Sequence, residues 1–245
     1  MFNHAVILAA GRGIRLIYMT SRIPKALVDV CGMPLINYSL LQLQKQIPQI
    51  TVTVGYKSDL LREALKDQKV SFLDTTGEGN AWWIFHTAFR ELDEPILVLP
   101  CDLLTPLDCK WLFKVYQQLQ APAFLQIPVA HPEGFEGDFM EEEEGRVTRF
   151  SRAGGIYYCS GLSILNPARL NQLLEPHADL PEVCQALVKI RQLYCSELYP
   201  YPWYSVNTKE QLATAIKWLK NEHISNTITG NCLSTTAVSY RDFSG

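Results

Sequence analysis

Short apolar runs alternate with amphipathic segments along the first half of the chain. The runs are stopped by glycine, proline or polar residues, which is typical of strands buried on both faces of a sheet. Strands are predicted at 6–10, 50–54, 70–73 and 95–100, and helices at 34–45, 58–65 and 82–92. This alternation predicts a parallel sheet with helices on both of its faces, joined by right-handed crossovers.

The second half of the chain repeats these signals around one polar segment. Helices are predicted at 107–119, 167–174, 180–191 and after 207–208, and strands at 123–129 and 156–165. Gly161 predicts a kink in the last of these strands. The four consecutive glutamates at 141–144 indicate a solvated hairpin tip rather than a metal site, because adjacent carboxylates repel and point in different directions.

A glycine turn with several cations follows the first predicted strand. Gly11 and Gly13 let backbone N–H groups approach an anion, and Arg12, Arg15 and Lys25 add positive charge. An ordinary turn with solvated cations is the alternative. The dinucleotide pattern G-x-G-x-x-G fails at position 16, and helix-breaking signals continue to position 24. The pattern therefore favours a long loop that holds a phosphate chain, as in a nucleoside triphosphate.

Two further features follow strands whose carboxyl ends should meet at the same edge of the sheet. The segment 74–81 is a second glycine turn that leads into a helix, and a plain helix start is its alternative interpretation. Asp102 follows the most apolar strand, and a buried carboxylate there requires a partner. We expect Asp102 to be a Mg²⁺ ligand; capping of a helix that starts near Pro106 is the alternative.

Length and composition are compatible with a single domain. The chain has 245 residues, 47% hydrophobic and 19% charged, with a net charge of -3, which gives no electrostatic reason to expect nucleic acid as a partner. Its seven cysteines are scattered and suggest neither disulfides nor a zinc site, so a cytoplasmic location is expected. No apolar run is long enough for a membrane span. We predict one domain at 1–228 and a tail at 229–245.

Three motifs close together resemble the opening signature of the sugar nucleotidyltransferases. They are LAAGRGIRL at 8–16, PKAL at 24–27 and GMPL at 32–35. Members of this family join a nucleoside triphosphate to a sugar 1-phosphate and release pyrophosphate. The resemblance extends to about residue 220 and is to the short form, without a β-helix domain. It implies a three-layer α/β/α, Rossmann-like fold with a mixed, mainly parallel sheet of the nucleotide-diphospho-sugar transferase type.

The resemblance also implies a role for each matching residue. Arg15 would bind the β- and γ-phosphates, and Lys25 would contact the α-phosphate and the sugar phosphate, while Asp102 and Asn207 would hold Mg²⁺. Nucleotide binding would involve Leu8, Ala9, Ala10, Gly11, Arg12, Gly13, Thr75, Gly77 and Glu78. Sugar-phosphate binding would involve Arg152, Cys159 and Gly161. The implied partners are an NTP and a sugar 1-phosphate, and a homo-oligomer is an open alternative to a monomer.

Several positions depart from the family pattern. Ile14 stands where threonine is usual, Ser205 replaces an aspartate near the second metal ligand, and Arg152 belongs to a segment that replaces an E-K-P motif. Cys159 replaces an asparagine that recognises the sugar. Two alternatives therefore stay open: a nucleotide- or nucleotide-sugar-binding protein that has lost catalysis, and a cytidylyltransferase for phosphocholine-like substrates.

Overall fold

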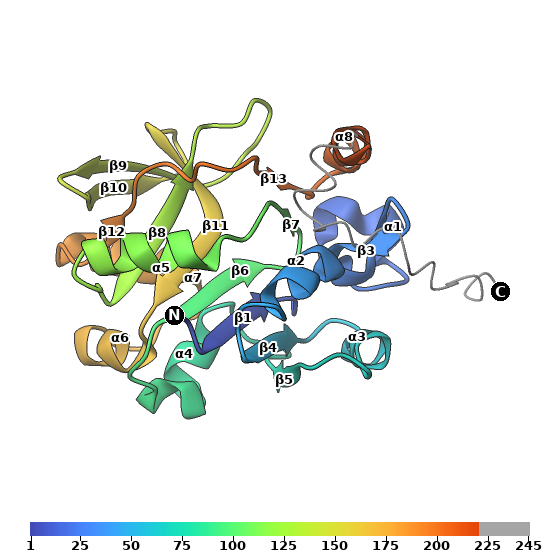
Figure 1. Cartoon of the computed structure of the whole chain (residues 1–245), viewed down its shortest axis with the longest axis horizontal. Helices are drawn as coiled ribbons and strands as arrows, with labels where there is room; N and C mark the ends of the chain where they lie inside the picture. Colours follow the sequence, from blue (N-terminus) through green and yellow to red (C-terminus); the bar gives the residue numbers. More distant parts are fainter. Residues whose placement is uncertain (221–245) are drawn as a thin grey trace.

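A mixed sheet forms the centre of the computed structural model, which describes residues 1–220 (Figure 1). The predicted tail 229–245 and the end of the predicted domain 1–228 lie outside the described residues. Within them, nine strands follow the order β5-β4-β1-β6-β11-β8-β12-β10-β9. Their bounds are β1 His4–Leu8, β4 Gln49–Val54, β5 Ser71–Asp74, β6 Ile96–Pro100, β8 Phe124–Val129, β9 Phe139–Glu143, β10 Arg146–Ser151, β11 Tyr157–Leu165 and β12 Tyr194–Cys195.

The half of the sheet built from the first hundred residues is parallel. Strand β1 pairs in parallel with β4 and β6, and β4 pairs in parallel with β5. Beyond β6 the sheet is no longer purely parallel. Strand β11 runs antiparallel to both of its neighbours, β6 and β8, and β10 runs antiparallel to β9. The mixed sheet implied by the family resemblance is thus confirmed. Because β1, β4, β5 and β6 all point the same way, their carboxyl ends form one edge.

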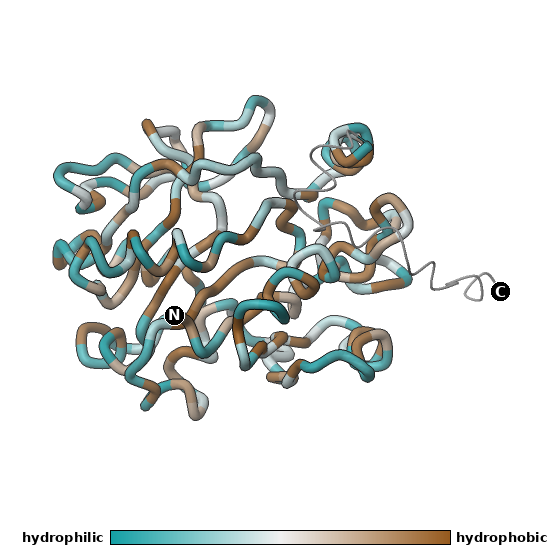
Figure 2. The backbone as a smooth tube through the Cα atoms, in the orientation of Figure 1, coloured by the Kyte–Doolittle hydropathy of each residue, from teal (hydrophilic) through white to brown (hydrophobic). Residues whose placement is uncertain are grey.

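Helices cover both faces of the sheet, as predicted. One layer consists of α2 Leu35–Leu43, α3 Ser58–Ala64 and α5 Cys109–Gln118; the other consists of α4 Trp82–His86, α6 Pro167–Leu173 and α7 Leu180–Lys189. Strand β1 shows why two layers form, because Ala5 and Ile7 pack into one apolar cluster and Val6 into the other. The apolar residues lie along the central strands (Figure 2).

A third apolar cluster joins elements near the beginning of the chain to those at the end of the described residues. It is formed by Leu16, Val28, Leu35, Leu104, Val206 and Leu212, among others. The elements around it are α1 Ile17–Thr20, β2 Asp29–Val30, β3 Met33–Pro34, β7 Leu103–Leu104, β13 Tyr204–Ser205 and α8 Lys209–Leu219. Strands β13 and β7 pair antiparallel, with Ser205 opposite Leu103. This pairing places residues 205–207 beside the end of β6.

Two predicted elements differ from the structure. The predicted helix 82–92 ends at His86, because Thr87 is extended (φ −122°, ψ −179°), and a 3₁₀ turn, Ala88–Glu91, follows. The predicted long loop after β1 contains a 3₁₀ turn, Ile14–Leu16, and the one-turn helix α1. The hydroxyl of Thr20 stabilises these turns by donating to the carbonyl oxygens of Gly13 (3.0 Å) and Leu16 (3.1 Å).

The glutamate-rich hairpin and the capping of α5 are also resolved by the structure. Strands β9 and β10 are joined at Glu144 and Gly145, both with positive φ (51° and 77°), so the predicted hairpin is present. Only Glu144 of the four glutamates lies at its tip, because Glu141, Glu142 and Glu143 belong to β9. Helix α5 begins at Cys109, and Asp108 is its N-cap, accepting from the amides of Lys110 and Trp111. The alternative role of Asp102 as a helix cap is therefore excluded.

Candidate active site

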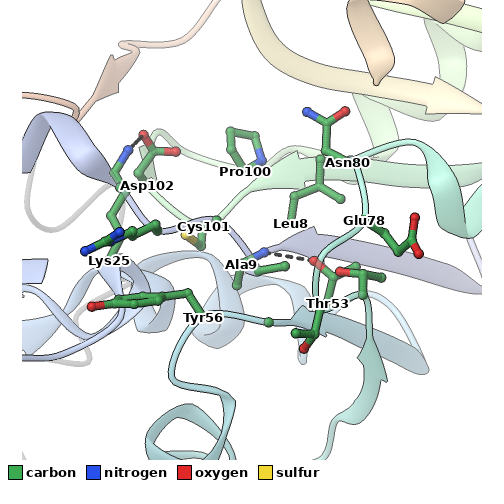
Figure 3. Close-up of a pocket in the computed structure, with 18 of the residues that line it drawn as sticks. Leu8, Ala9, Lys25, Thr53, Tyr56, Glu78, Asn80, Pro100, Cys101 and Asp102 are labelled. Carbon is green, nitrogen blue, oxygen red and sulfur yellow. Dashed lines mark hydrogen bonds and ion pairs between the residues drawn. The ribbon is translucent and has the colours of Figure 1, made fainter. Parts of the chain in front are cut away.

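A cleft of about 780 Å³ lies at the carboxyl ends of β1, β4, β5 and β6. It is lined by the loop after β1, by the second glycine turn, and by Lys25, Asp102 and Asn207. All the residues predicted to bind the nucleotide line it: Leu8, Ala9, Ala10, Gly11, Arg12, Gly13, Thr75, Gly77 and Glu78. Figure 3 shows Lys25 and Asp102 together at one end of this cleft and Glu78 at the other.

The loop after β1 is fixed by backbone contacts to its neighbouring strands. The amide of Ala9 donates to Thr53 Oγ1 (3.0 Å), and the carbonyl of Ala10 accepts from the amide of Tyr56 (2.9 Å). Gly13 has φ +64°, and a Cβ there would lie 2.9 Å from Lys25 Cβ, so only glycine fits. The amides of residues 10–13 donate no hydrogen bond to the described residues. They are available to an anion.

Three side chains that are far apart in the sequence meet at the end of β6. Lys25 Nζ donates to Asp102 Oδ2 (2.5 Å) and to Asn207 Oδ1 (2.8 Å). Arg15 also donates to Asn207 Oδ1 (2.7 Å). The Lys25 and Asp102 side chains are only 14% and 7% exposed. The positive side chains of Arg15 and Lys25 thus outnumber the single carboxylate of Asp102. The remaining positive charge would favour a bound phosphate chain.

The two predicted metal ligands are arranged so that one small cation can contact both. Asp102 Oδ2 and Asn207 Oδ1 already converge on a single positive group, Lys25 Nζ. Mg²⁺ in nucleotide enzymes commonly uses one or two protein oxygens together with phosphate oxygens and water, and these two oxygens fit that role. Within residues 1–220, no cluster of three or more His, Cys, Asp or Glu side chains forms another metal site.

A second cleft, of about 940 Å³, adjoins the first and contains the predicted sugar-phosphate residues. Arg15 and Asn207 line both clefts. Arg152 is 82% exposed, and its Nε lies 3.3 Å from Asp138 Oδ1. Burial raises the pKa of the Cys159 thiol, so it is uncharged near neutral pH. Gly161 has φ +86°, and a Cβ on this residue would lie 2.9 Å from Pro100 Cγ. Glycine is therefore required at this bend of β11.

The structure adds an aromatic wall to the second cleft, which the sequence did not reveal. The second cleft is lined by His131, Phe135, Phe139, Phe150 and Tyr158, with the carboxylates of Glu136 and Asp138 beside them. The rings lie on three separate stretches of chain and have no common spacing. Only folding of the hairpin against β11 brings them together.

The second glycine turn is held by the start of α7, which the sequence also did not reveal. Asp179 Oδ1 accepts from the amide of Asn80 (3.1 Å), and Asn80 Oδ1 accepts from the amide of Leu180 (2.7 Å). A Cβ on Gly79 would lie 2.2 Å from the carbonyl oxygen of Ala178. Glycine is therefore required by close packing. The sequence does not indicate this contact, because 99 positions separate Asp179 from Asn80.

No helix among residues 1–220 has the length and apolar character needed to cross a membrane.

Comparisons with known proteins bear on the family and the fold of the chain. Residues 5–139 match the family described as "MobA-like NTP transferase domain". Mannose-1-phosphate guanyltransferase beta-A of Xenopus laevis is 25% identical over 228 residues, which cover 86% of this chain and 63% of that protein. The chain thus spans less than two thirds of that relative's length.

Solved structures with the same fold extend over most of the chain. A putative glucose-1-phosphate thymidylyltransferase from Bacillus anthracis superposes with a TM-score of 0.74 at 16% identity, covering 89% of this chain and 95% of that one. The CTP:phosphocholine cytidylyltransferase of Streptococcus pneumoniae gives 0.70 at 21% identity, covering 89% and 100%. At these identities the likeness shows the fold, and it confirms the predicted fold type.

Proposed function

Because the chain belongs to the family of MobA-like NTP transferase domains, we propose that it transfers a nucleoside monophosphate from an NTP to a small phosphorylated metabolite. The acceptor is a sugar 1-phosphate or a related compound, and pyrophosphate is released. The observation that carries this proposal is the meeting of Arg15, Lys25, Asp102 and Asn207 where the two clefts join. A donor in the first cleft and an acceptor in the second would react there.

The proposed roles are those that the family resemblance implies, and the positions of the residues in the two clefts support them. The free amides of residues 10–13 and the Arg15 guanidinium bind the phosphate chain, and Arg15 stabilises charge on the departing pyrophosphate. Lys25 contacts the α-phosphate and draws the acceptor phosphate toward it. No general base is needed, since the attacking phosphate oxygen is already ionised near pH 7. Asp102 and Asn207 hold Mg²⁺, which neutralises phosphate charge when bound.

The test is pyrophosphate release with each of the four common NTPs, Mg²⁺ and a panel of sugar 1-phosphates. One NTP and one acceptor should release pyrophosphate, and Asp102→Ala should reduce kcat/KM by at least about a hundredfold. Asp93→Ala is the control, because Asp93 is an exposed partner of Arg169. Thermal stabilisation by nucleotides without any release of pyrophosphate would support a binding protein that has lost catalysis.

A cytoplasmic location is part of the proposal and is tested by cell fractionation.

A second acceptor class is favoured by the lining of the second cleft. Aromatic rings next to carboxylates attract organic cations, and here His131, Phe135, Phe139 and Tyr158 lie with Glu136 and Asp138. A phosphorylated amino alcohol is therefore the alternative to a sugar phosphate. CTP with phosphocholine belongs in the same panel. Turnover of phosphocholine, together with no turnover of any sugar 1-phosphate in the panel, would favour this class.

A further inference from the structure

Ser205 connects the two residues proposed to hold the metal. It is 7% exposed and lies on β13, opposite Leu103 of β7. Its hydroxyl lies 3.0 Å from Asp102 Oδ2, and it accepts from Asn207 Nδ2 at 2.7 Å. Asp102 and Asn207 are separated by more than a hundred positions in the sequence, so this serine is a direct physical link between them.

The direction of each hydrogen bond in this link is fixed by chemistry. An ionised carboxylate can only accept, so the single hydroxyl proton of Ser205 goes to Asp102. The serine oxygen can then only accept, and it requires the NH₂ end of the Asn207 amide. The other end of the amide, Oδ1, accepts from Arg15 (2.7 Å) and Lys25 (2.8 Å). If the Asn207 amide were flipped, its oxygen would face a lone pair of the Ser205 oxygen. Its NH₂ group would face the N–H donors of Arg15 and Lys25.

We propose that Ser205 is a positioning residue that aims the Asn207 oxygen at the cation site. The inference rests on the proposed function, because it needs Asp102 and Asn207 to hold the metal. A neutral asparagine can bind a metal only through its oxygen, whereas its NH₂ end repels a cation. Asparagine therefore needs a group that sets its orientation, and Ser205 supplies that group from the residue two positions earlier.

The test measures the affinity of the protein for Mn²⁺ alone, by electron paramagnetic resonance. Ser205→Ala should weaken Mn²⁺ binding by about tenfold, which is the lower end of the effect of outer partners of metal ligands. Ser205→Thr keeps the hydroxyl and should restore most of the affinity. Ser196→Ala is the matched control, since Ser196 is also 7% exposed but its hydroxyl donates, among residues 1–220, only to the carbonyl oxygen of Glu197. Thermal unfolding identifies any variant that fails to fold.

The same serine substitution, made in the Asn207→Asp protein, separates an orienting role of Ser205 from general support of the site. In Asn207→Asp, both side-chain oxygens can bind a metal, so no orienting group is needed. There, Ser205→Ala should change the Mn²⁺ affinity by less than about twofold, and the double-mutant cycle should show coupling. Equal losses in both backgrounds would overturn the inference, because Ser205 would then act through Asp102 or through the fold.

The same measurements separate failure of this inference from failure of the proposed function. If Asp102→Ala abolishes Mn²⁺ binding while Ser205→Ala leaves it unchanged, the orienting role is wrong and the proposed metal site stands. If Asp102→Ala leaves Mn²⁺ binding unchanged, the metal lies elsewhere, and both the inference and the proposed metal ligands are overturned.

Discussion

Lys25 stands where its positive charge would compete with the divalent cation proposed for this site. Its ammonium group contacts both Asp102 Oδ2 and Asn207 Oδ1, the two oxygens proposed to hold Mg²⁺. A metal can reach them only when Lys25 turns away, and an incoming phosphate would give the lysine a new partner. Metal and nucleotide should therefore bind together more readily than either binds alone.

At the scale of single residues, we predict that Lys25→Ala tightens the binding of Mn²⁺ to the nucleotide-free protein by roughly tenfold or more. The reason is the loss of a like charge a few ångströms from the metal. Electron paramagnetic resonance of free Mn²⁺ measures the change. Lys66→Ala is the control, because Lys66 is exposed and paired with Glu63. Unchanged or weaker binding would show that lysine and metal occupy different positions.

The sequence predicted those site residues that belong to local motifs and missed those that depend on long-range contacts. Gly13 and Arg15 stand out because a glycine turn with cations follows an apolar strand. Asp179 does not stand out, since its partner Asn80 lies 99 positions away. Ser205 stands out only because it replaces an aspartate of the family pattern, and its contact with Asp102, 103 positions away, could not be predicted. A short polar residue on a short strand has no pattern of its own.

At the scale of elements, the start of α5 depends on one carboxylate. Asp108 accepts from two amides of the helix and from Tyr201 (2.5 Å). Burial alone would raise the pKa of Asp108, but hydrogen bonds from Tyr201, Trp111 and Lys110 lower it below its usual range. The stabilisation is therefore present above the unfolded pKa of about 3.9 and is lost as the pH falls through the folded pKa.

We predict that Asp108→Ala lowers the free energy of unfolding at pH 7 by about 1–2 kcal/mol, the typical value of an N-cap. The difference from the unmodified protein should shrink as the pH falls below about 4. Asp108→Asn is the control, because asparagine also caps helices but does not titrate. Urea unfolding at several pH values measures all three proteins. A difference that does not depend on pH would exclude a role for the charge.

The longer helices and six of the nine strands of the main sheet could be predicted from apolar periodicity, within a few residues at their ends. The helix expected at 82–92 fails at Thr87, where the backbone is extended and the hydroxyl accepts from the amide of Phe89. The helical turns at 14–20 were missed because they depend on Thr20 bonding back to Gly13 and Leu16. The Thr87 hydroxyl competes with the backbone hydrogen bonds of the helix, whereas the Thr20 hydroxyl adds to those of the turns. The spacing of apolar residues does not reveal such side-chain hydrogen bonds.

At the scale of the whole molecule, nucleotide binding should stabilise the fold, since the first cleft is built from both ends of the described chain. At about a hundred times its Kd, the cognate NTP with Mg²⁺ contributes about 2.7 kcal/mol. For a chain of this size we therefore predict a rise in Tm of roughly 5–10 °C.

Differential scanning fluorimetry with each NTP measures this rise and identifies the base. The Asp102→Ala protein is the comparison, and it should lose most of the Mg²⁺-dependent part of the shift. Equal shifts with all four bases would contradict a base-selective first cleft. The homo-oligomer that the family resemblance leaves open is a separate prediction, tested by light scattering.

The bend at Gly161 has a consequence for how new acceptor specificities could arise. Before it, Tyr157 and Tyr158 pair with β9; after it, residues 163–165 pair with β6. The aromatic wall of the second cleft thus lies mainly on the chain before this bend, in a hairpin (the acceptor lobe) that pairs with β11 and β12, while the first cleft is carried mainly by the first hundred residues. Exchange of residues 131–158 between relatives, by recombination or design, would replace the acceptor lobe and leave the donor cleft's own strands in place.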